Sequence, residues 1–336
     1  MHQIGEKTKA GPAFLVTGAT GLIGSSVVRQ ALKGGGPCCF ILPVRNRDKA
    51  AKIYGDLEGP DCRKLHFVET QLETISPEQF PMPIDYVVHC ACVTQPADMA
   101  AYPVETADSI VVGTKNVLEV ARKKQVKSMV YLSSMEVYGR VEDTGGLVKE
   151  NQLGALDLKA PRSSYSMGKR MAEHYCYIYH HEYKVPVKVA RLAQTFGKGV
   201  RPGDSRVYMQ FARAAYEGKD IVLKTTGDSM GNYCAIDDAI EGIFTILYKG
   251  GDGEAYNVVH EANTMRIRNM AELVAGRLTG GKSRVRIEAG GPDKNSYAPD
   301  TGLRLSGEKL RGLGWAPRKN LEEMYRDMIG ELGRIT

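Results

Sequence analysis

The chain has 336 residues, 43% of them apolar and 25% charged, and a formal net charge of +6 at pH 7. It is long enough for a large core in two interlocked lobes, but no stretch approaches the roughly 18 apolar residues of a membrane span. The positive charges are dispersed, and the compact cluster at residues 122–124 fits a helix C-terminus rather than a nucleic-acid footprint. We therefore expect no membrane or nucleic-acid partner and, because residues 1–12 lack the apolar core of a secretion signal, a cytoplasmic location.

The first predicted elements are a strand, a glycine turn and a helix. Residues 14–16 are an apolar run, residues 17–24 are turn-like, and residues 22–32 carry apolar side chains at helical spacing. The turn holds three evenly spaced glycines, Gly18, Gly21 and Gly24. Glycines let backbone N–H groups approach phosphate oxygens, and the helix dipole favours an anion. The pattern predicts a diphosphate-binding turn, and its alternative is a purely structural strand-to-helix connection.

The second predicted strand, residues 39–44, runs into Arg45, Asn46 and Arg47. The acidic residue expected about 20 residues after a dinucleotide-binding turn, which would bind the adenosine ribose, is missing. Two guanidinium groups at that point would suit a 2′-phosphate, because arginine offers a planar fork of donors. The segment therefore favours NADP over NAD, unless both arginines are simply solvated loop charges.

A later predicted strand ends in hydroxyl groups. Residues 129–132 are a β-type apolar run, and Ser133 and Ser134 follow where the carboxyl end of a parallel strand would open onto a cleft. The Ser134 hydroxyl is placed to hydrogen-bond a substrate oxygen. This position predicts a polar site beside the glycine turn.

Tyr165 and Lys169 are four residues apart on a predicted helix, so their side chains share one face. A free tyrosine has a pKa near 10 and is a poor base at neutral pH. A lysine ammonium and an oxidised nicotinamide would both favour the phenolate, and lowering its pKa to about 7 would take roughly 4 kcal/mol. The pair predicts an acid/base group that exchanges a proton with a substrate hydroxyl, and a surface pair is the alternative.

Strands and helices alternate through about residue 183, which predicts an α/β fold with a parallel sheet wound on both faces. Beyond it we expect short strands at 221–223, 255–259 and 284–287, and helices at 206–218, 237–248, 269–278 and 321–331. Seven cysteines and seven histidines show no metal-site spacing, so no metal is predicted and the cysteines are expected to be reduced thiols.

Together these motifs make the chain resemble an extended short-chain dehydrogenase/reductase of the NAD-dependent epimerase/dehydratase family, whose members modify nucleotide-diphosphate sugars. The resemblance covers nearly the whole chain. Besides the glycines, Ser134 and the Tyr165–Lys169 pair, it rests on residues 89–92, 113–119, 134–139, 191–197 and 313–324.

The resemblance implies a Rossmann-like fold with a smaller mixed α/β substrate lobe. Residues 1–193, with 233–260 and 305–336 returning to them, would form the dinucleotide-binding domain. Residues 194–232 and 261–304 would form the substrate lobe. A homodimer is implied as well, because helices around residues 103–124 and 164–183 pair two subunits in relatives.

The resemblance also implies site residues. Tightly bound NAD or NADP would contact Gly18, Thr20, Gly21, Leu22, Ile23, Gly24, Arg45, Asn46, Arg47, Ala91, Ser133, Tyr165 and Lys169. The catalytic residues would be Ser134, Tyr165, Lys169 and Glu136, and substrate contacts would come from Ser134, Met135, Gln194, Arg206 and Tyr233. Gln194 replaces a usual asparagine and Gly231 a phosphate-binding arginine, which puts those two substrate contacts in doubt. For Glu136 a carboxylate bonded to a neighbouring loop is the alternative, and for Arg206 an exposed loop arginine.

The implied reaction is transient oxidation at the sugar C4 followed by return of the hydride. Dehydratases of the family carry two carboxyl groups where this chain has Met135 and Glu136, and a methionine cannot protonate a departing hydroxyl. Epimerisation of a nucleotide-diphosphate sugar is therefore the favoured outcome. UDP-glucuronate decarboxylation and NADPH-dependent reduction of a 4-ketosugar are the alternatives among enzymatic functions. The alternative from another class of function is a non-catalytic relative that senses cofactor or binds RNA.

Overall fold

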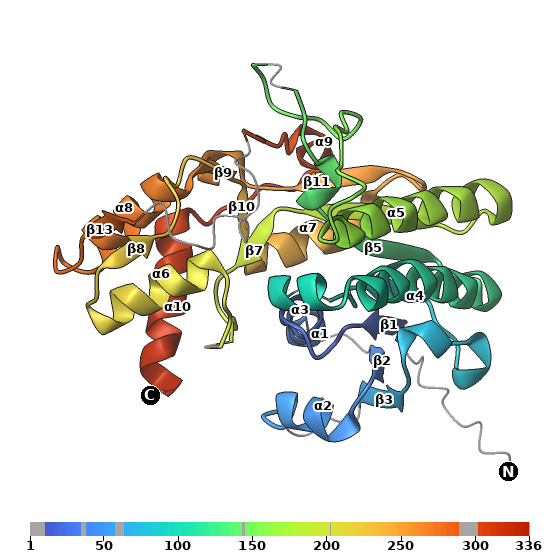
Figure 1. Cartoon of the computed structure of the whole chain (residues 1–336). Helices are drawn as coiled ribbons and strands as arrows, with labels where there is room; N and C mark the ends of the chain where they lie inside the picture. The colour runs from blue at the N-terminus through green and yellow to red at the C-terminus, as the bar shows by residue number, and fades with distance from the viewer. Residues whose placement is uncertain are drawn as a thin grey trace, which may run out of the picture.

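The computed structural model describes residues 11–34, 38–57, 64–93, 95–142, 145–201, 203–288 and 302–335. These form a large parallel sheet covered by helices, with a smaller lobe of short strands and helices beside it (Figure 1). The predicted α/β class with a doubly wound parallel sheet is confirmed.

The main sheet has seven strands in the order β11-β6-β5-β4-β1-β2-β3, and all six pairings are parallel. The strands are β1 (Ala13–Thr17), β2 (Cys39–Val44), β3 (Leu65–Glu69), β4 (Tyr86–His89), β5 (Ser128–Ser134), β6 (Val187–Leu192) and β11 (Ala255–Val258). The strand order reverses between β1 and β4, so the chain leaves these strands toward opposite edges. Ligands of such sheets bind at the carboxyl ends of the strands at this point.

The strands are apolar runs because both faces of the sheet are covered. Phe14 and Val16 of β1 pack with α1 (Leu22–Lys33) and α7 (Ile236–Lys249), whereas Leu15 faces the other way. Successive side chains of a strand point to opposite faces, so a strand buried on both sides needs apolar residues throughout.

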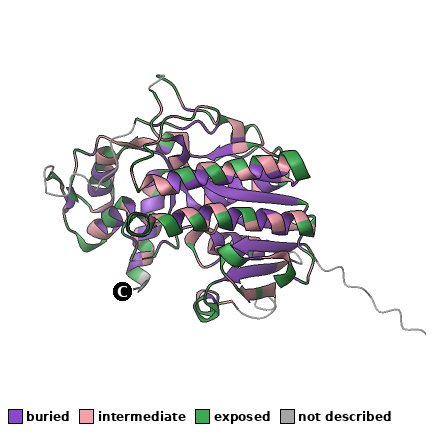
Figure 2. Cartoon of the chain, turned by 45° about the vertical axis from the view of Figure 1, so that its right-hand side comes forward, coloured by how far each residue is buried: buried purple, intermediate pink, exposed green. Residues whose placement is uncertain are grey.

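The opposite face is covered by the two longest helices, α4 (Pro103–Lys124) and α5 (Ser163–Tyr183). Figure 2 shows them lying side by side across the buried strands, with exposed residues along their outer surface. Helix α5 also carries Tyr165 and Lys169 on its buried side, so packing on the sheet positions both side chains.

The smaller lobe has its own apolar core. Its helices are α6 (Val207–Glu217), α8 (Ile267–Leu278) and α10 (Leu321–Ile335), and its two-stranded pairings are β7 (Gln194–Phe196) with β10 (Tyr233–Ala235), β8 (Ile221–Leu223) with β13 (Val285–Ile287), and β9 (Met230–Gly231) with β12 (Met265–Arg266). The remaining short helices are α2 (Arg47–Ile53), α3 (Pro96–Ala101), α9 (Glu308–Arg311), η2 (Leu72–Thr74), η3 (Pro77–Gln79), η4 (Met135–Tyr138) and η5 (Glu261–Asn263).

Residues 305–336 contribute to two cores, and the expectation that they return to the dinucleotide-binding domain stays a prediction. Leu310 and Trp315 do join the core on the main sheet. Met324, Tyr325 and Met328 of α10 instead join the core of the smaller lobe, beside α6 and α8 (Figure 1). The apolar stripe of α10 fits either surface by its spacing alone, and the contacts assign the helix to the smaller lobe.

A buried histidine ties β1, β4 and α4 together at the switch point. His89 is 1% exposed, its Nδ1 lies 2.7 Å from Thr17 Oγ1, and its Nε2 lies 3.1 Å from Thr114 Oγ1. Burial, with a smaller contribution from the charge of Lys169, lowers the pKa of His89 to about 3. The ring is therefore neutral in the folded protein across the physiological range.

This histidine predicts a loss of stability on acidification. Between its unfolded pKa of about 6.5 and its folded value, only the unfolded chain binds the proton, so the free energy of unfolding falls by about 1.4 kcal/mol per pH unit. Between pH 7 and pH 5 His89 should therefore contribute a loss of about 2 kcal/mol, measurable by urea unfolding. The variant His89→Asn should lack this part of the loss, whereas His174→Asn, at an exposed position of α5, should keep it. Equal pH dependence in wild type and His89→Asn would contradict the assignment.

Candidate active site

The glycine turn joins β1 to α1 at the switch point, and two of its glycines have no room for a side chain. Gly18 has a φ of +68°, and a Cβ there would lie 2.7 Å from Ala91 N. A Cβ on Gly24 would lie 2.4 Å from Gly18 O. No side chain fits at such distances. The backbone of Gly18 therefore packs directly against that of Ala91 on one side and that of Gly24 on the other, and all three are predicted cofactor residues.

The N-terminus of α1 is available to an anion. Gly21, its N-cap, provides no side-chain cap, and the first helical turn contains no acidic residue. The first N–H groups of a helix are unpaired and carry a partial positive charge, which suits a diphosphate. Thr20, Leu22 and Ile23 surround this point and are partly buried. The geometry fits the pyrophosphate of a dinucleotide.

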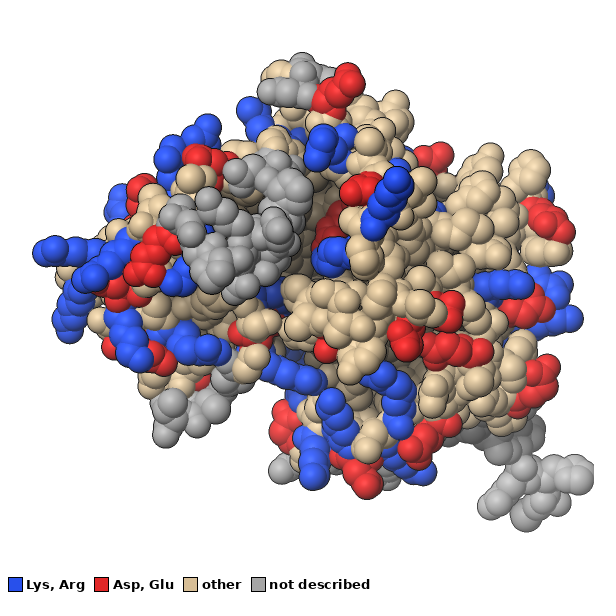
Figure 3. Space-filling model, viewed as in Figure 1, with Lys and Arg blue, Asp and Glu red and all other residues tan. Residues whose placement is uncertain are grey.

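The residues after β2 are exposed. Arg45, Asn46 and Arg47 all lie at the surface, and Asn46 Oδ1 accepts a hydrogen bond from Lys49 N at 2.7 Å as the N-cap of α2. Basic side chains gather around α2 on the face seen in Figure 3. The capping role explains Asn46 without a ligand, and the preference for a 2′-phosphate stays a prediction.

Ser133 and Ser134 end β5, at the same edge of the sheet as the glycine turn that follows β1. Ser134 Oγ accepts a hydrogen bond from Glu136 N at 3.2 Å and so caps η4. The Ser133 hydroxyl is buried, and no described residue hydrogen-bonds it. A buried hydroxyl without a partner is costly unless a ligand or water supplies one, so Ser133 fits a contact with a bound group.

Lys169 is not part of a surface pair. Its side chain lies inside the protein at 3% exposure, and its Nζ donates to Leu132 O at 2.7 Å. The same Nζ lies 4.8 Å from the ring centroid of Tyr131 and 5.9 Å from that of Tyr165. The structure therefore brings Lys169 and Tyr165 to the end of β5, beside Ser134.

Burial raises the pKa of Tyr165 well above its ordinary value near 10, and the nearby Cys92 and Glu136 act in the same direction. The neighbouring hydroxyl of Ser134 and the charge of Arg162 act to lower it. The protein groups alone therefore do not produce the phenolate expected near neutral pH, because desolvation outweighs them.

Two residues near Tyr165 were missed by the sequence reasoning. Cys92 follows β4, and burial raises the pKa of its thiol, whereas the nearby Lys169 acts to lower it. Arg162, just before α5, places its Cζ 5.4 Å from the Tyr165 ring centroid and donates to Glu136 Oε1 at 2.9 Å. Cys92 ends the segment 89–92 that contributes to the family resemblance, whereas Arg162 belongs to no motif. The packing of α5 on the sheet brings both residues to Tyr165.

Glu136 bonds to α5. Besides Arg162, Ser166 Oγ donates to Glu136 Oε2 at 3.3 Å. This arrangement matches the alternative interpretation of Glu136, a carboxylate bonded to a neighbouring segment. A catalytic role for Glu136 stays a prediction.

Arg206, like Ser134 among the predicted substrate residues, lies near enough to Tyr165 for an electrostatic interaction. It pairs with Asp204, with Nε 3.0 Å from Oδ1 and Nη2 2.5 Å from Oδ2, and its Cζ lies 4.9 Å from the Tyr208 ring centroid. Arg206 is therefore a guanidinium held in place, and not a freely moving loop side chain.

The other predicted substrate residues, Gln194, Met135 and Tyr233, differ from one another in exposure and in packing. Gln194 is exposed on β7, and Met135 packs against a small core next to η4. Tyr233 is 1% exposed and packs edge-on against Phe196 in the smaller lobe. A Cβ at Gly231 would lie 2.0 Å from the Tyr233 hydroxyl, so the Tyr233 ring fills the space that a side chain at Gly231 would need. Substrate contacts by Gln194, Met135 and Tyr233 stay predictions.

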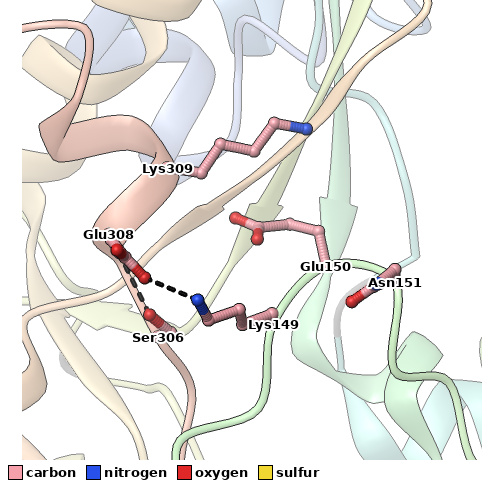
Figure 4. Close-up of a pocket in the computed structure, with 6 residues that line it drawn as sticks. All are labelled: Lys149, Glu150, Asn151, Ser306, Glu308 and Lys309. Carbon is pink, nitrogen blue, oxygen red and sulfur yellow. Dashed lines mark hydrogen bonds and ion pairs between the residues drawn. The ribbon is translucent and has the colours of Figure 1, made fainter.

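A polar pocket lies elsewhere, between the loop before α5 and the segment around α9 (Figure 4). Its lining residues are Lys149, Glu150, Asn151, Ser306, Glu308 and Lys309, none of them a predicted site residue. Lys149 and Glu308 form an ion pair across it at 2.8 Å. Over the described ranges, no three His, Cys, Asp or Glu side chains gather as metal ligands, and no helix is long and apolar enough to cross a bilayer.

Comparison with known proteins decides the family. The model of the NAD dependent epimerase/dehydratase family matches residues 14–259, from β1 through β11. The chain belongs to this family. Its relatives of known activity are enzymes, and the predicted dependence on a nicotinamide dinucleotide agrees with the family.

Several members of the epimerase/dehydratase family resemble the chain over nearly its full length. UDP-glucuronic acid decarboxylase 6 of Arabidopsis thaliana is 25% identical over 317 residues, which cover 92% of this chain and 85% of the relative. The dTDP-D-glucose 4,6-dehydratase of Bos taurus is 27% identical over 328 residues, covering 94% and 87%. The family members named here differ in reaction, so membership alone does not choose among epimerisation, decarboxylation and dehydration.

Solved structures agree in fold. UDP-glucose 4-epimerase of Thermotoga maritima, solved with UDP-glucose, has a TM-score of 0.80 at 22% identity, covering 96% of this chain and 99% of that one. UDP-glucuronic acid 4-epimerase of Bacillus cereus, in complex with UDP-glucuronic acid and NAD, has a TM-score of 0.79 at 18% identity, covering 96% and 100%.

Proposed function

We propose that the chain modifies the sugar of a nucleotide-diphosphate sugar by transient oxidation at C4, with epimerisation as the net result. The observation that carries the proposal is the meeting of Ser134, Tyr165 and Lys169 at the carboxyl end of β5, on the same edge of the sheet as the uncapped N-terminus of α1. An acid/base group, a hydroxyl donor and an anion-binding helix end are thereby gathered at the switch point of one sheet.

The dinucleotide would be held by its pyrophosphate over Gly18, Gly21 and Gly24, with Ser133 and Lys169 near its nicotinamide end. Bound nicotinamide supplies hydride acceptance from the sugar carbon and return of that hydride. Two observations support this placement. The backbone of the turn packs closely at Gly18 and Gly24, and the buried Ser133 hydroxyl has no hydrogen-bond partner among the described residues. Whether the cofactor is NAD or NADP depends on Arg45 and Arg47.

The chain's own residues would move the proton. Ser134 lies near enough to Tyr165 to influence its pKa, so one sugar hydroxyl can be held between the two side chains. Tyr165 takes that proton when the carbon is oxidised and returns it when the carbon is reduced. The Nζ of Lys169, fixed by its hydrogen bond to Leu132 O, lies beside the phenol.

Epimerisation is favoured over dehydration because Met135 leaves Glu136 without a second carboxyl group beside it, and Glu136 is itself bonded to Arg162. Decarboxylation of UDP-glucuronate is the second candidate. It is favoured by the similarity to decarboxylases of Arabidopsis thaliana and by Arg206, a held cation near Tyr165 suited to a carboxylate or phosphate.

Product mass separates these candidates. The purified protein should be incubated with a panel of nucleotide-diphosphate sugars, with and without added NAD and NADP, and the products analysed by mass spectrometry and chromatography. An epimerase gives a product of unchanged mass that elutes separately and needs no stoichiometric cofactor. Loss of carbon dioxide from UDP-glucuronate would identify a decarboxylase, and NADPH consumed in step with product would identify a reductase.

We also propose a homodimer through the outer surface of α4 and α5. Met167, Met171 and Tyr177 of α5 and Val112 of α4 are exposed apolar side chains on these helices. Tyr177 stacks between His174 and His181, which extends a flat aromatic strip along α5. Apolar side chains aligned on neighbouring helices favour association with a second copy.

A charge on that surface should separate the subunits. Met171→Glu is expected to sediment with the mass of one chain, whereas the wild-type protein has the mass of two, because an unpaired carboxylate would be buried in the interface. Val222→Glu, an exposed apolar position on β8 in the smaller lobe, should leave the mass unchanged. A Met171→Glu protein that keeps the mass of two chains would place the interface elsewhere.

A further inference from the structure

Two cations of one helix flank the phenol of Tyr165. Arg162 lies three residues before it and Lys169 four residues after it, so both project from the same side of α5 as the tyrosine. The Arg162 Cζ is 5.4 Å and the Lys169 Nζ 5.9 Å from the Tyr165 ring centroid. The guanidinium is thus as close to the ring as the ammonium.

Arg162 is held in this position from outside the helix. Its Nη2 donates to Glu136 Oε1 at 2.9 Å, and the other carboxylate oxygen of Glu136 is bonded by Ser166 Oγ. Its Nη1 is buried, and no described residue accepts a hydrogen bond from it. One carboxylate and one aromatic ring are therefore the contacts that fix the guanidinium.

Stability does not account for this arrangement. The side chains of Arg162 and Glu136 are 38% and 39% exposed, and ion pairs so accessible to water stabilise a protein by only about 0–1 kcal/mol. Leaving a guanidinium nitrogen buried without an acceptor costs free energy in addition. A cation placed over the ring of an acid/base tyrosine has instead an electrostatic effect on that tyrosine.

We propose that Arg162 is a positioning residue that favours ionisation of Tyr165, and that Glu136 is the counterion that holds Arg162 over the ring. The inference rests on the proposed function in one respect, the role of Tyr165 as the group that exchanges the proton. It gives Glu136 a role through Arg162, in place of direct proton transfer to the sugar.

The two charges should act on Tyr165 with opposite signs. Arg162 stabilises the phenolate, and Glu136 destabilises it. Within the part of the chain that the structure describes, seven titratable, charged or hydroxyl-bearing groups face Tyr165. They are Cys92 after β4, Tyr131 and Ser134 of β5, Glu136 of η4, Arg162 at the N-cap of α5, Lys169 of α5, and Arg206 before α6. Without Arg162, no guanidinium offsets the effect of the Glu136 carboxylate on the pKa of Tyr165. In Glu136→Gln, the carboxylate is replaced by a neutral amide, and the positive charge of Arg162 remains beside Tyr165.

The ionisation of Tyr165 can be measured without substrate. Protein labelled with ¹³C at the tyrosine Cζ and loaded with the dinucleotide should be titrated by NMR, with Tyr165→Phe identifying the resonance. In Arg162→Met the pH of half-ionisation is expected to rise by about one unit, a tenfold lower phenolate population at a given pH. In Glu136→Gln it should fall, and in Arg162→Lys it should move less than in Arg162→Met.

Arg326→Met is the matched control, because it removes an arginine from an exposed pair with Glu322 on α10, in the other lobe. It should leave the titration unchanged. An unchanged value in Arg162→Met, or shifts of the same sign in Arg162→Met and Glu136→Gln, would overturn the proposal. Because the readout needs no sugar, opposite shifts in a protein that turns over no nucleotide sugar would refute the proposed function and leave this inference standing.

Discussion

Tyr165→Phe is expected to lower turnover by about a thousandfold or more while dinucleotide affinity stays within about twofold of wild type. The substitution removes one hydroxyl and keeps the ring that packs against Lys169 and Arg162. Positioned proton transfer contributes about 10²- to 10⁴-fold to catalysis, and no other described side chain replaces this hydroxyl next to Ser134. Turnover should be measured with the substrate found by the panel, and affinity by calorimetry.

The control for this variant is Tyr248→Phe, which removes a hydroxyl from an exposed position of α7, outside the candidate site and the proposed subunit interface. It should leave turnover unchanged. If Tyr165→Phe retained wild-type turnover, the assigned acid/base role would be wrong even if the fold and the cofactor assignment were right.

Gly24→Ala is expected to weaken dinucleotide binding at least about tenfold and to lower the free energy of unfolding by about 1–3 kcal/mol. A Cβ there would lie 2.4 Å from Gly18 O and 2.7 Å from Gly18 C, so the backbone of the turn must move. The N–H groups at the start of α1 would move with it. Tenfold weaker binding corresponds to about 1.4 kcal/mol.

Gly276→Ala provides the matched control in a helix interior. A Cβ at Gly276 of α8 meets nothing within 4 Å, so alanine should stabilise the protein by about 0.5–1 kcal/mol and leave dinucleotide binding unchanged. Calorimetry and urea unfolding of both variants test the contrast. Unaltered dinucleotide affinity in Gly24→Ala would show that the turn does not hold the pyrophosphate.

The elements that the sequence predicts well are those with a strong local pattern. The expected helix at 237–248 is α7, Ile236–Lys249, and the expected strand at 221–223 is β8, Ile221–Leu223. The glycine turn and the Tyr165–Lys169 pair could be predicted equally well. The turn lies within one strand-to-helix connection, and the pair lies within one helix. Apolar periodicity and residue spacing are sufficient for such features.

The features that the sequence did not predict depend on contacts between distant segments. Arg162 is held at the site by Glu136, which lies 26 residues earlier in the chain. The pKa of Cys92 is affected by Lys169, which lies 77 residues later. The two-residue strands β9 and β12 form a ladder too short to leave any pattern. The raised pKa of Tyr165 likewise follows from burial, which the spacing of Tyr165 and Lys169 does not reveal.

The central claim is that the sugar is oxidised at C4 and reduced again without exchange with water. The most direct test is a nucleotide-diphosphate sugar deuterated at C4, converted by the purified protein in ordinary water and analysed by mass spectrometry and NMR. We predict that the product retains the deuterium at C4 and that turnover is slower than with the unlabelled sugar. A product that has lost the label, or has been formed with C4 untouched and no isotope effect, would contradict the account.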